Sequence, residues 1–281
     1  MPSSPFHPDR PALVQRLRAA GCVYAEDEAE LLIAAADSPD TLTTLVDRRV
    51  GGLPLEHVLG WAEFCGLRVA VDPGVFVPRG RTALLVETAA AVCGPAPAVV
   101  DLCCGSGATT VALAARLAPR WLAAVDVDPA AVACARRNLA GRDVAVLQGD
   151  LYDPLPVARR GRLDLVVANA PYVPTEAVAL MPAEARLHEA PVALDGGADG
   201  LAVLRRVAAG AVDWLAPGGH LVVEVSDGQA DALCAAMTAL GLVPTVVRED
   251  EWDATGVLAR RPRGSRTGPA VRGVAGRGSG N

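Results

Sequence analysis

The sequence Asn169-Ala170-Pro171-Tyr172 directly follows an apolar run, residues 163–168, that is typical of a buried strand. The side-chain oxygen of Asn169 and the backbone carbonyl of Ala170 can accept both hydrogens of a planar NH2 group. Pro171 stiffens the corner, and the Tyr172 ring offers a flat surface for stacking. These four residues predict a substrate clamp for an amide or an aryl amine.

Such a clamp favours attack by a nitrogen that is normally a poor nucleophile because its lone pair is delocalised. Two acceptors that hold both hydrogens favour the pyramidal nitrogen that attack requires, which is preorganisation for the transition state. With a sulfonium methyl donor beside it, the reaction is an in-line methyl transfer. The alkylated nitrogen is acidic and loses its proton without a catalytic histidine. We therefore assign catalysis to Asn169 and Tyr172 and interpret the histidines as structural or surface residues: His7, His57, His188 and His220.

A glycine-rich segment, Asp101-Leu102-Cys103-Cys104-Gly105-Ser106-Gly107, lies between a predicted strand and a predicted helix. Its glycines let the backbone approach a ligand closely, and the N–H groups of the helix point into the same space. The dinucleotide fingerprint needs a third glycine, where this chain has Thr110. The remaining pattern favours a nucleoside with a short charged tail and no pyrophosphate.

Two further carboxylates follow the next two apolar runs. Asp126 can accept hydrogen bonds from both ribose hydroxyls. The alternative for Asp126 is a helix cap, but Asp128, directly before Pro129, fits that role better, which leaves Asp126 free for a ligand. Asp150 could accept from an exocyclic amine while the next residue, Leu151, packs against a purine. An ordinary turn aspartate is an equally good interpretation of Asp150.

The elements that must position these residues alternate between strand and helix from residue 97 onward. Short, continuously apolar runs between helices indicate a doubly wound α/β domain. The expected strands span residues 98–102, 121–125, 144–147, 163–168, 220–225, 244–247 and 255–259. The expected helices span residues 109–117, 129–139, 201–215 and 229–240.

Three short helices are expected before this domain, over residues 12–20, 25–36 and 42–49, with a break at residues 37–40. Apolar and polar positions then alternate over residues 64–77. This alternation predicts two strands with a turn at Asp72-Pro73-Gly74.

The composition limits the partners of this 281-residue chain, which is 51% hydrophobic and carries a formal net charge of −6. Four arginines and no acid follow Arg261, and removing them leaves −10 for the rest. Because the binding of nucleic acid rests on cation–phosphate contacts, the acidic charge of residues 1–261 disfavours a nucleic-acid partner, except through the tail that follows Arg261. Seven cysteines without a C-x-x-C pair indicate neither a disulfide framework nor a metal site and fit a reducing compartment. Because no apolar segment suits a signal or a bilayer span, we expect a cytoplasmic protein without a membrane partner.

The chain also resembles a family, the HemK-type protein-(glutamine-N5) methyltransferases, which are release factor glutamine methyltransferase-like proteins. The resemblance runs over residues 53–261 and includes N-A-P-Y, where the family carries N-P-P-Y. The other segments that carry it are residues 54–60, 63–67, 76–79 with Thr82, Leu84, Val86 and Glu87, then 101–102, 105–107, 124–126, 189–191 and 193–197.

The resemblance implies an α/β class I S-adenosylmethionine-dependent methyltransferase fold, with a Rossmann-like, seven-stranded doubly wound sheet. It implies an N-terminal helical substrate-recognition domain (1–52), a linker with a β-hairpin (53–80), the methyltransferase domain (81–261) and a disordered Arg/Gly-rich tail (262–281). The methyl donor would be S-adenosyl-L-methionine. The acceptor would be the N5 nitrogen of a protein glutamine, in the Gly-Gly-Gln loop of a peptide-chain release factor or in a ribosomal protein.

Carried over by position, residues 103–107 would surround the methionine part of the donor and Asp126 would hold its ribose. Asp150 and Leu151 would meet the adenine. The glutamine amide would lie against residues 169–172. The donor site so implied comprises Asp101, Cys103, Cys104, Gly105, Ser106, Gly107, Asp126, Asp150, Leu151 and Asn169.

Three positions depart from the family pattern. Cys103 stands where the family commonly has a glycine, and Ala170 replaces a proline while keeping the backbone carbonyl. The P-R-P-[ED]-T-E stretch has Arg81 and Ala83 in place of two acids.

Two alternatives to glutamine methylation remain open from the sequence. N-x-P-Y also occurs in enzymes that methylate exocyclic amines of RNA or DNA, and the arginine-containing tail favours that activity. A methyltransferase-shaped binding module without turnover is the other alternative, motivated by Cys103 and Ala170.

Overall fold

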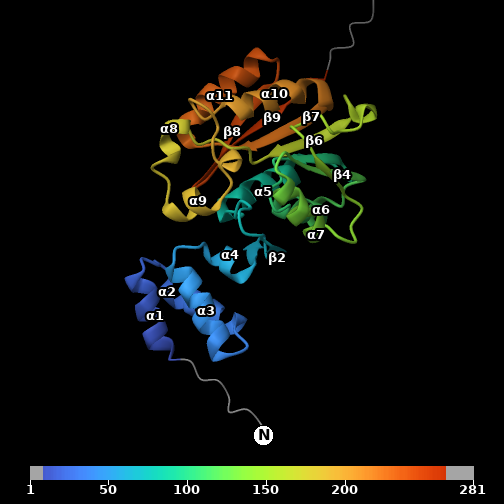
Figure 1. Ribbon diagram of the computed structural model, residues 1–281. Coiled ribbons are helices and arrows are strands. Elements are labelled where there is room, and N and C mark those ends of the chain that lie inside the picture. The colour runs from blue at the N-terminus through green and yellow to red at the C-terminus, as the bar shows by residue number, and fades with distance from the viewer. Residues whose placement is uncertain (1–8, 264–281) are drawn as a thin grey trace, which may run out of the picture.

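The computed structural model describes residues 9–263, which form a group of N-terminal helices, a hairpin and a larger α/β domain (Figure 1). His7 and the predicted disordered tail, apart from residues 262 and 263, lie outside the described residues. Within the described range, no helix has both the length and the apolar character to cross a membrane.

The α/β domain contains a seven-stranded sheet, as predicted. Its strands are β3 (Ala98–Leu102), β4 (Trp121–Asp126), β5 (Ala145–Gln148), β6 (Leu163–Ala168), β7 (Leu215–Glu224), β8 (Val243–Glu249) and β9 (Ala254–Arg260). The strand order is β5-β4-β3-β6-β7-β9-β8, and β9 alone runs opposite to the other six strands. The strand predicted over residues 220–225 is β7, which begins five residues earlier, at Leu215.

Helices cover both faces of this sheet (Figure 1). One face packs against α5 (Ala83–Val92), α6 (Ala108–Leu117) and α7 (Pro129–Asn138), and the other against α10 (Ala202–Trp214) and α11 (Asp227–Ala239). Each face has its own buried cluster because side chains alternate along a strand: Val99 belongs to the first, whereas Val100 and Leu102 belong to the second. The strands are thus apolar on both sides, which explains why they read as continuous apolar runs.

The strand order reverses beside β3. From β3 the chain proceeds outward to β4 and β5, and then returns to place β6 on the opposite side of β3. In open α/β sheets, ligands bind at the carboxyl ends of the strands at such a switch point. The pairing register strengthens this expectation, because Leu102 of β3 lies opposite both Val125 of β4 and Ala168 of β6. The residues that follow these three positions, Cys103, Asp126 and Asn169, therefore stand side by side.

The N-terminal helices are α1 (Arg10–Ala19), α2 (Ala25–Ala35), α3 (Pro39–Val50) and α4 (Leu55–Leu59). They enclose a separate apolar core around Leu17, Leu32 and Val46. The third predicted helix starts three residues earlier than expected, at Pro39. Ser38 caps it by accepting from the Thr41 N–H at 3.1 Å. The expected break between the second and third helices is present but covers residues 36–38, because Pro39 and Asp40 already belong to α3.

The hairpin joins strands β1 (Trp61–Phe64) and β2 (Leu67–Ala70), and its turn was predicted in the wrong place. The turn lies at Cys65-Gly66, whose φ angles of 51° and 71° suit a two-residue hairpin. Asp72-Pro73-Gly74 forms a later turn, closed by the Val75 N–H donating to the Asp72 carbonyl at 3.1 Å. No strand is assigned to residues 75–79, and Gly74 forms an isolated bridge with Glu189, in which its carbonyl accepts from the Ala190 N–H at 3.1 Å.

Short helical turns complete the fold: η1 (Gly80–Thr82), η2 (Val157–Arg159), α8 (Thr175–Val178), α9 (Ala183–His188) and η3 (Pro191–Ala193). A buried arginine joins α9 to the N-terminal helices. Arg49 of α3 donates to both carboxylate oxygens of Glu28 in α2, at 2.5 and 2.9 Å, and to Glu184 of α9 at 2.6 Å. The charge of Arg49 thus holds two parts of the chain that are far apart in sequence.

We predict that Arg49→Ala lowers the free energy of unfolding of the chain by about 3 kcal/mol, because it leaves the buried carboxylate of Glu28 uncompensated. Glu184→Ala removes a half-exposed partner of the same guanidinium and should cost less than about 1 kcal/mol. Urea unfolding of both variants measures the difference, and equal losses would contradict the assignment.

Candidate functional site

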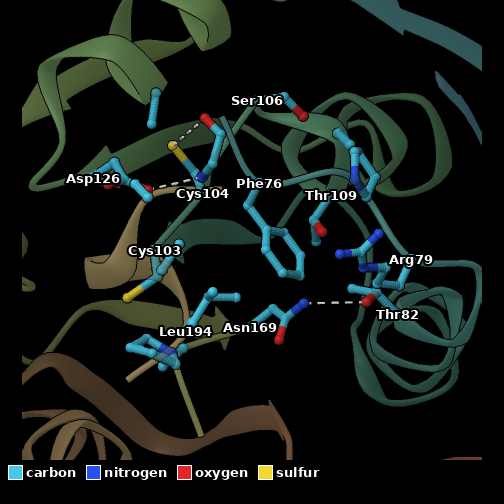
Figure 2. Close-up of a pocket in the computed structure, with 18 of the residues that line it drawn as sticks. Phe76, Arg79, Thr82, Cys103, Cys104, Ser106, Thr109, Asp126, Asn169 and Leu194 are labelled. Carbon is cyan, nitrogen blue, oxygen red and sulfur yellow. Dashed lines mark hydrogen bonds between the residues drawn. The ribbon is translucent and has the colours of Figure 1, made fainter. Parts of the chain in front are cut away.

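A pocket opens at the carboxyl ends of β3, β4 and β6, where the switch point predicts it (Figure 2). Two of its walls are the glycine-rich loop (residues 103–107) and residues 169–173. We call residues 169–172 the Asn169 corner. The other walls are the end of β4, the segment before α5 and residues 181–194, which we call the return segment. The expected site residues that line it are Cys103, Cys104, Gly105, Ser106, Asp126, Asn169, Ala170, Pro171 and Tyr172. Asp101, Gly107, Asp150 and Leu151 are not among its lining residues.

The glycine-rich loop turns through left-handed backbone conformations. Gly105 and Gly107 have φ angles of 55° and 80°, and a Cβ added to Gly107 would lie 3.1 Å from the Cβ of Ala135 in α7. Cys103 also adopts a positive φ, 55°, which costs an ordinary L-residue roughly 1–2 kcal/mol. A glycine, which the family commonly has at this position, takes this conformation without that cost.

Asp126 lines the pocket and also holds the glycine-rich loop. Its Oδ2 accepts from the Gly105 N–H at 2.8 Å, and its Oδ1 accepts from the Asp128 N–H at 2.9 Å. Each oxygen still has a second lone pair for a ligand hydroxyl. Burial raises the pKa of Asp126, and the backbone donors oppose that rise. Asp128 caps α7 as predicted, accepting from the Ala130 N–H at 2.9 Å.

Asp101 lies behind the loop rather than in the pocket. It is 1% exposed, and it accepts a 2.5 Å hydrogen bond from the hydroxyl of Thr110 in α6. Burial raises the pKa of Asp101 to about 7; the Thr110 bond opposes this shift and the nearby charge of Asp126 adds to it. Asp101 therefore joins β3 to α6, beneath the loop that the two elements flank.

Asp150 and Leu151 are not brought into the pocket. The Asp150 carboxylate pairs with Arg206 of α10 at 2.6 Å. Leu151 has a φ of 49° and packs into the buried cluster on the α10–α11 face. Neither residue lines this cavity, although the family resemblance implied that both would contact adenine.

The Asn169 amide is oriented by a residue whose role sequence reasoning missed. Its Nδ2 donates to the hydroxyl oxygen of Thr82 at 3.1 Å, and Thr82 is 3% exposed (Figure 2). Because the NH2 end is engaged, the Oδ1 end remains as the acceptor that the clamp requires. The available signal was the position of Thr82 in the P-R-x-x-T stretch of the family resemblance.

The backbone at the end of the Asn169 corner is held by residues 194–196, where the return segment ends, and by α11. The Val173 N–H donates to the Leu194 carbonyl at 3.1 Å, and the Gly196 N–H donates to the Val173 carbonyl at 2.8 Å. A Cβ added to Gly196 would lie 2.7 Å from the Pro171 carbonyl oxygen, so only glycine fits there. The side chain of Gln229 in α11 also donates to the Tyr172 carbonyl, at 2.9 Å.

Tyr172 is anchored by a buried carboxylate that no motif indicated. Its hydroxyl donates to Glu224 Oε1 at 2.9 Å, and Arg81 Nε reaches the same oxygen at 3.2 Å. Glu224 ends β7 and is 3% exposed, so Arg81 supplies the positive charge that compensates it. Burial raises the pKa of Tyr172, and the charge of Glu224 adds to the rise. Both effects favour the protonated phenol, and the Tyr172 side chain lines the pocket with its hydroxyl held by Glu224.

An aromatic ring lies across the centre of the pocket. Phe76 extends between the Asp126 side and Asn169, and Arg79 lies over its ring at 5.0 Å from the centroid (Figure 2). Among the described histidines, His57, His188 and His220 do not line the pocket. The glycine-rich loop and the oriented amide of Asn169 thus line the same pocket.

Comparisons with known proteins agree on the family. The Methyltransferase small domain family matches residues 66–208. The chain is 39% identical over 208 residues to the "Release factor glutamine methyltransferase" of Geobacter sulfurreducens, covering 73% of this chain and 72% of that protein. It is 41% identical over 234 residues to the protein of the same name from Mycolicibacterium smegmatis, covering 77% and 83%.

A solved structure supports the fold alone. A methyltransferase from Pyrococcus furiosus superposes with a TM-score of 0.54 at 17% identity, covering 70% of this chain and 90% of that one. The expected class I methyltransferase fold is thereby confirmed.

We predict that the buried Asp101 makes the chain less stable as the pH rises. Its pKa of about 7 in the folded chain lies above the ordinary value of 3.8, so the folded chain binds the proton more tightly than the unfolded chain. The free energy of unfolding should therefore fall between about pH 4 and pH 8, by about 2–4 kcal/mol from this residue.

Asp101→Asn keeps an oxygen for Thr110 and removes the titration, so its unfolding free energy should depend less on pH and exceed the wild-type value at pH 8. Urea unfolding from pH 5 to pH 8 measures this. Asp150→Asn, at the half-exposed Arg206 pair, is the matched control. A slope for Asp101→Asn that matches the wild type would refute the prediction.

Proposed function

The chain belongs to the release factor glutamine methyltransferase family, and on that premise we propose that it methylates the N5 nitrogen of a glutamine in a peptide-chain release factor, with S-adenosyl-L-methionine as the methyl donor. The observation that carries the proposal is the Asn169 amide. Thr82 fixes its orientation, and the sheet register places it beside the glycine-rich loop.

The residues at the glycine-rich loop fit the donor. A Cβ at Gly105 would meet no atom within 4 Å, so the backbone there is open to a ligand. Asp126 is fixed by two backbone N–H groups and has lone pairs left for ribose hydroxyls. When bound, S-adenosyl-L-methionine supplies a methyl group on a positively charged sulfur. The chain's contribution is to hold the acceptor nitrogen in line with that methyl group.

The Asn169 corner fits a primary amide. Asn169 Oδ1 and the Ala170 carbonyl accept the two hydrogens of the amide, which favours the pyramidal nitrogen. Replacement of the family's proline by Ala170 leaves this carbonyl in place. After transfer the acidic nitrogen gives its proton to solvent, so neither a histidine nor the high-pKa phenol of Tyr172 is needed as a base.

The N-terminal helices fit the role of recognising a protein acceptor. They form their own core, and Arg49 links them to α9 in the segment that follows the Asn169 corner. We assign α1–α4 to acceptor recognition on this basis. A protein acceptor also suits the acidic body better than RNA or DNA, which the formal charge of −10 would repel.

The test is methyl transfer from labelled donor to a purified release factor. We expect label on the release factor and none on a variant whose Gly-Gly-Gln glutamine is alanine. Ribosomal proteins, total RNA and DNA serve as parallel acceptors. Mass spectrometry of release factors from cells with and without the gene should show one methyl group on that glutamine. Label in RNA or DNA alone would overturn the proposal.

We predict that Asn169→Ala lowers kcat/KM at least about 100-fold, since it removes an acceptor aimed at the reacting nitrogen. Thr82→Val should lower it about tenfold by freeing the amide to rotate, whereas Thr82→Ser keeps the hydroxyl and should stay near wild type. Donor affinity should remain within a few-fold in all three. A large loss of donor affinity in Asn169→Ala would mean that the assigned role is wrong.

We predict that Asp126→Ala weakens donor binding by about 1–3 kcal/mol, because buried ligand hydroxyls lose an ionised partner. Calorimetric titration with the donor measures this. Asp128→Ala is the control, because it removes the cap of α7 and leaves the Asp126 carboxylate in place. Unchanged affinity in Asp126→Ala would remove this residue from the donor site.

A further inference from the structure

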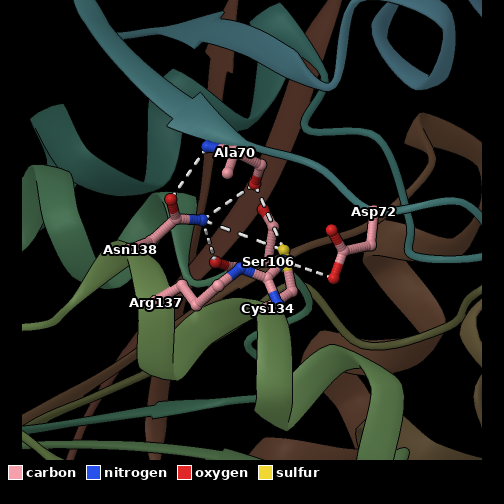
Figure 3. Close-up of polar contacts among 6 residues, drawn as sticks. All are labelled: Ala70, Asp72, Ser106, Cys134, Arg137 and Asn138. Atoms are coloured by element: carbon pink, nitrogen blue, oxygen red, sulfur yellow. Dashed lines mark hydrogen bonds and ion pairs between the residues drawn. The ribbon is translucent and has the colours of Figure 1, made fainter.

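A single asparagine side chain joins three parts of the fold outside the pocket. Asn138 is the last residue of α7 (Figure 3). Its Oδ1 accepts from the Ala70 N–H at 2.8 Å, and its Nδ2 donates to the carbonyls of Ala70 and Ser106, both at 2.8 Å. Ala70 ends β2 of the hairpin, and Ser106 lies inside the glycine-rich loop.

The orientation of this amide follows from its partners. Two carbonyl oxygens can face only the NH2 end, and one backbone N–H can face only the oxygen end. Both hydrogens of the amide are thus used, one on the hairpin and one on the loop. A carboxylate of the same shape would place an oxygen against two carbonyl oxygens.

Both partners need this contact. β2 has β1 as its neighbour in a two-stranded sheet, so its outer edge lacks a strand to pair with, and Asn138 satisfies both backbone groups of Ala70. Ser106 is 2% exposed, so its carbonyl would lose its partner in a buried position if Asn138 were removed. The loop must also stay close to α7, because Gly107 packs against Ala135.

Two other contacts tie α7 to the same stretch of chain without reaching the loop. The Cys134 thiol donates to the Ala70 carbonyl at 3.2 Å. Arg137 forms an ion pair with Asp72 (Figure 3). In this cluster, the contact to the glycine-rich loop is made by Asn138. The Cys134 sulfur also lies 3.9 Å from Asn138 Nδ2, whereas Arg137 touches neither Ala70 nor Ser106, so Arg137 provides the independent control and Cys134 tests the contact to the hairpin alone.

The chain that leaves Ala70 soon becomes a wall of the pocket, with Phe76, Arg79 and Thr82 among its lining residues. Thr82 orients Asn169. We propose that Asn138 is a positioning residue that fixes the position of the glycine-rich loop relative to the hairpin. The affinity for the donor therefore depends on Asn138, although Asn138 does not line the pocket. The identity of the donor rests on the proposed function, but the contact itself does not.

The test compares Asn138→Ala with Cys134→Ala and Arg137→Ala. Titration of each with S-adenosyl-L-methionine, well below the unfolding temperature, gives the donor Kd, and thermal unfolding gives Tm. We expect Asn138→Ala to raise the Kd about tenfold, and both controls to stay within about twofold. Asn138→Asp should raise it further, since its carboxylate would face two carbonyls. Hydrogen exchange of residues 103–107 should also increase in Asn138→Ala but not in Cys134→Ala.

Wild-type affinity and exchange in Asn138→Ala would overturn the proposal. An equal loss in Cys134→Ala at a similar Tm would also overturn it, because the effect would then follow general destabilisation. If the wild-type chain binds the donor but methylates no release factor, the proposed function fails, and the role of Asn138 is still decided by the binding data. A wild-type chain that binds no donor would overturn both.

Discussion

The alignment of three strand ends is the constraint on which the site depends. Leu102 of β3 is paired with Val125 of β4 and with Ala168 of β6, so Cys103, Asp126 and Asn169 begin at one level of the sheet. The pairing of the strands alone thereby brings together residues that lie far apart in the sequence. A one-residue slip of β6 would turn its apolar side chains to the opposite face and displace the Asn169 corner. The buried clusters on both faces therefore protect the site as well as the fold.

Buried carboxylates surround this alignment, and arginines compensate most of them. Glu224 and Glu189 are almost fully buried, and each accepts from an arginine that lines the pocket, Arg81 or Arg79. Both arginines come from the short segment before α5. The cost of burying each carboxylate makes the arginine positions hard to vary alone, because removal of one partner leaves an uncompensated charge. Arg81, a departure from the family pattern, thus has a clear structural partner, and it also keeps Tyr172 in place through Glu224.

The hairpin and the segment after it connect the two halves of the site. Asn138 holds the hairpin against the glycine-rich loop, and Thr82, further along the same segment, orients the Asn169 amide. The glycine-rich loop and the Asn169 corner are therefore linked through one continuous stretch of backbone. Arg49 extends the connection to the N-terminal helices through α9. The acceptor recognition that we propose for those helices would thereby be joined to the chemistry that we propose for the pocket.

Local patterns in the sequence determined the strands, most helices, the glycine-rich loop and the Asn169 corner, because apolar periodicity and turn residues act over a few neighbouring positions. They failed where two local signals competed, as when Asp72-Pro73-Gly74 outweighed the true turn at Cys65-Gly66. Only the tertiary structure decided the strand order, the backbone bonds of Asp126 and the removal of Asp150 from the pocket. It also decided the partners of Thr82, Glu224 and Asn138, which lie dozens of residues away along the chain. Such pairs exist only once the sheet has assembled, since hydrogen-bond partners are set by distance in space rather than by distance in sequence.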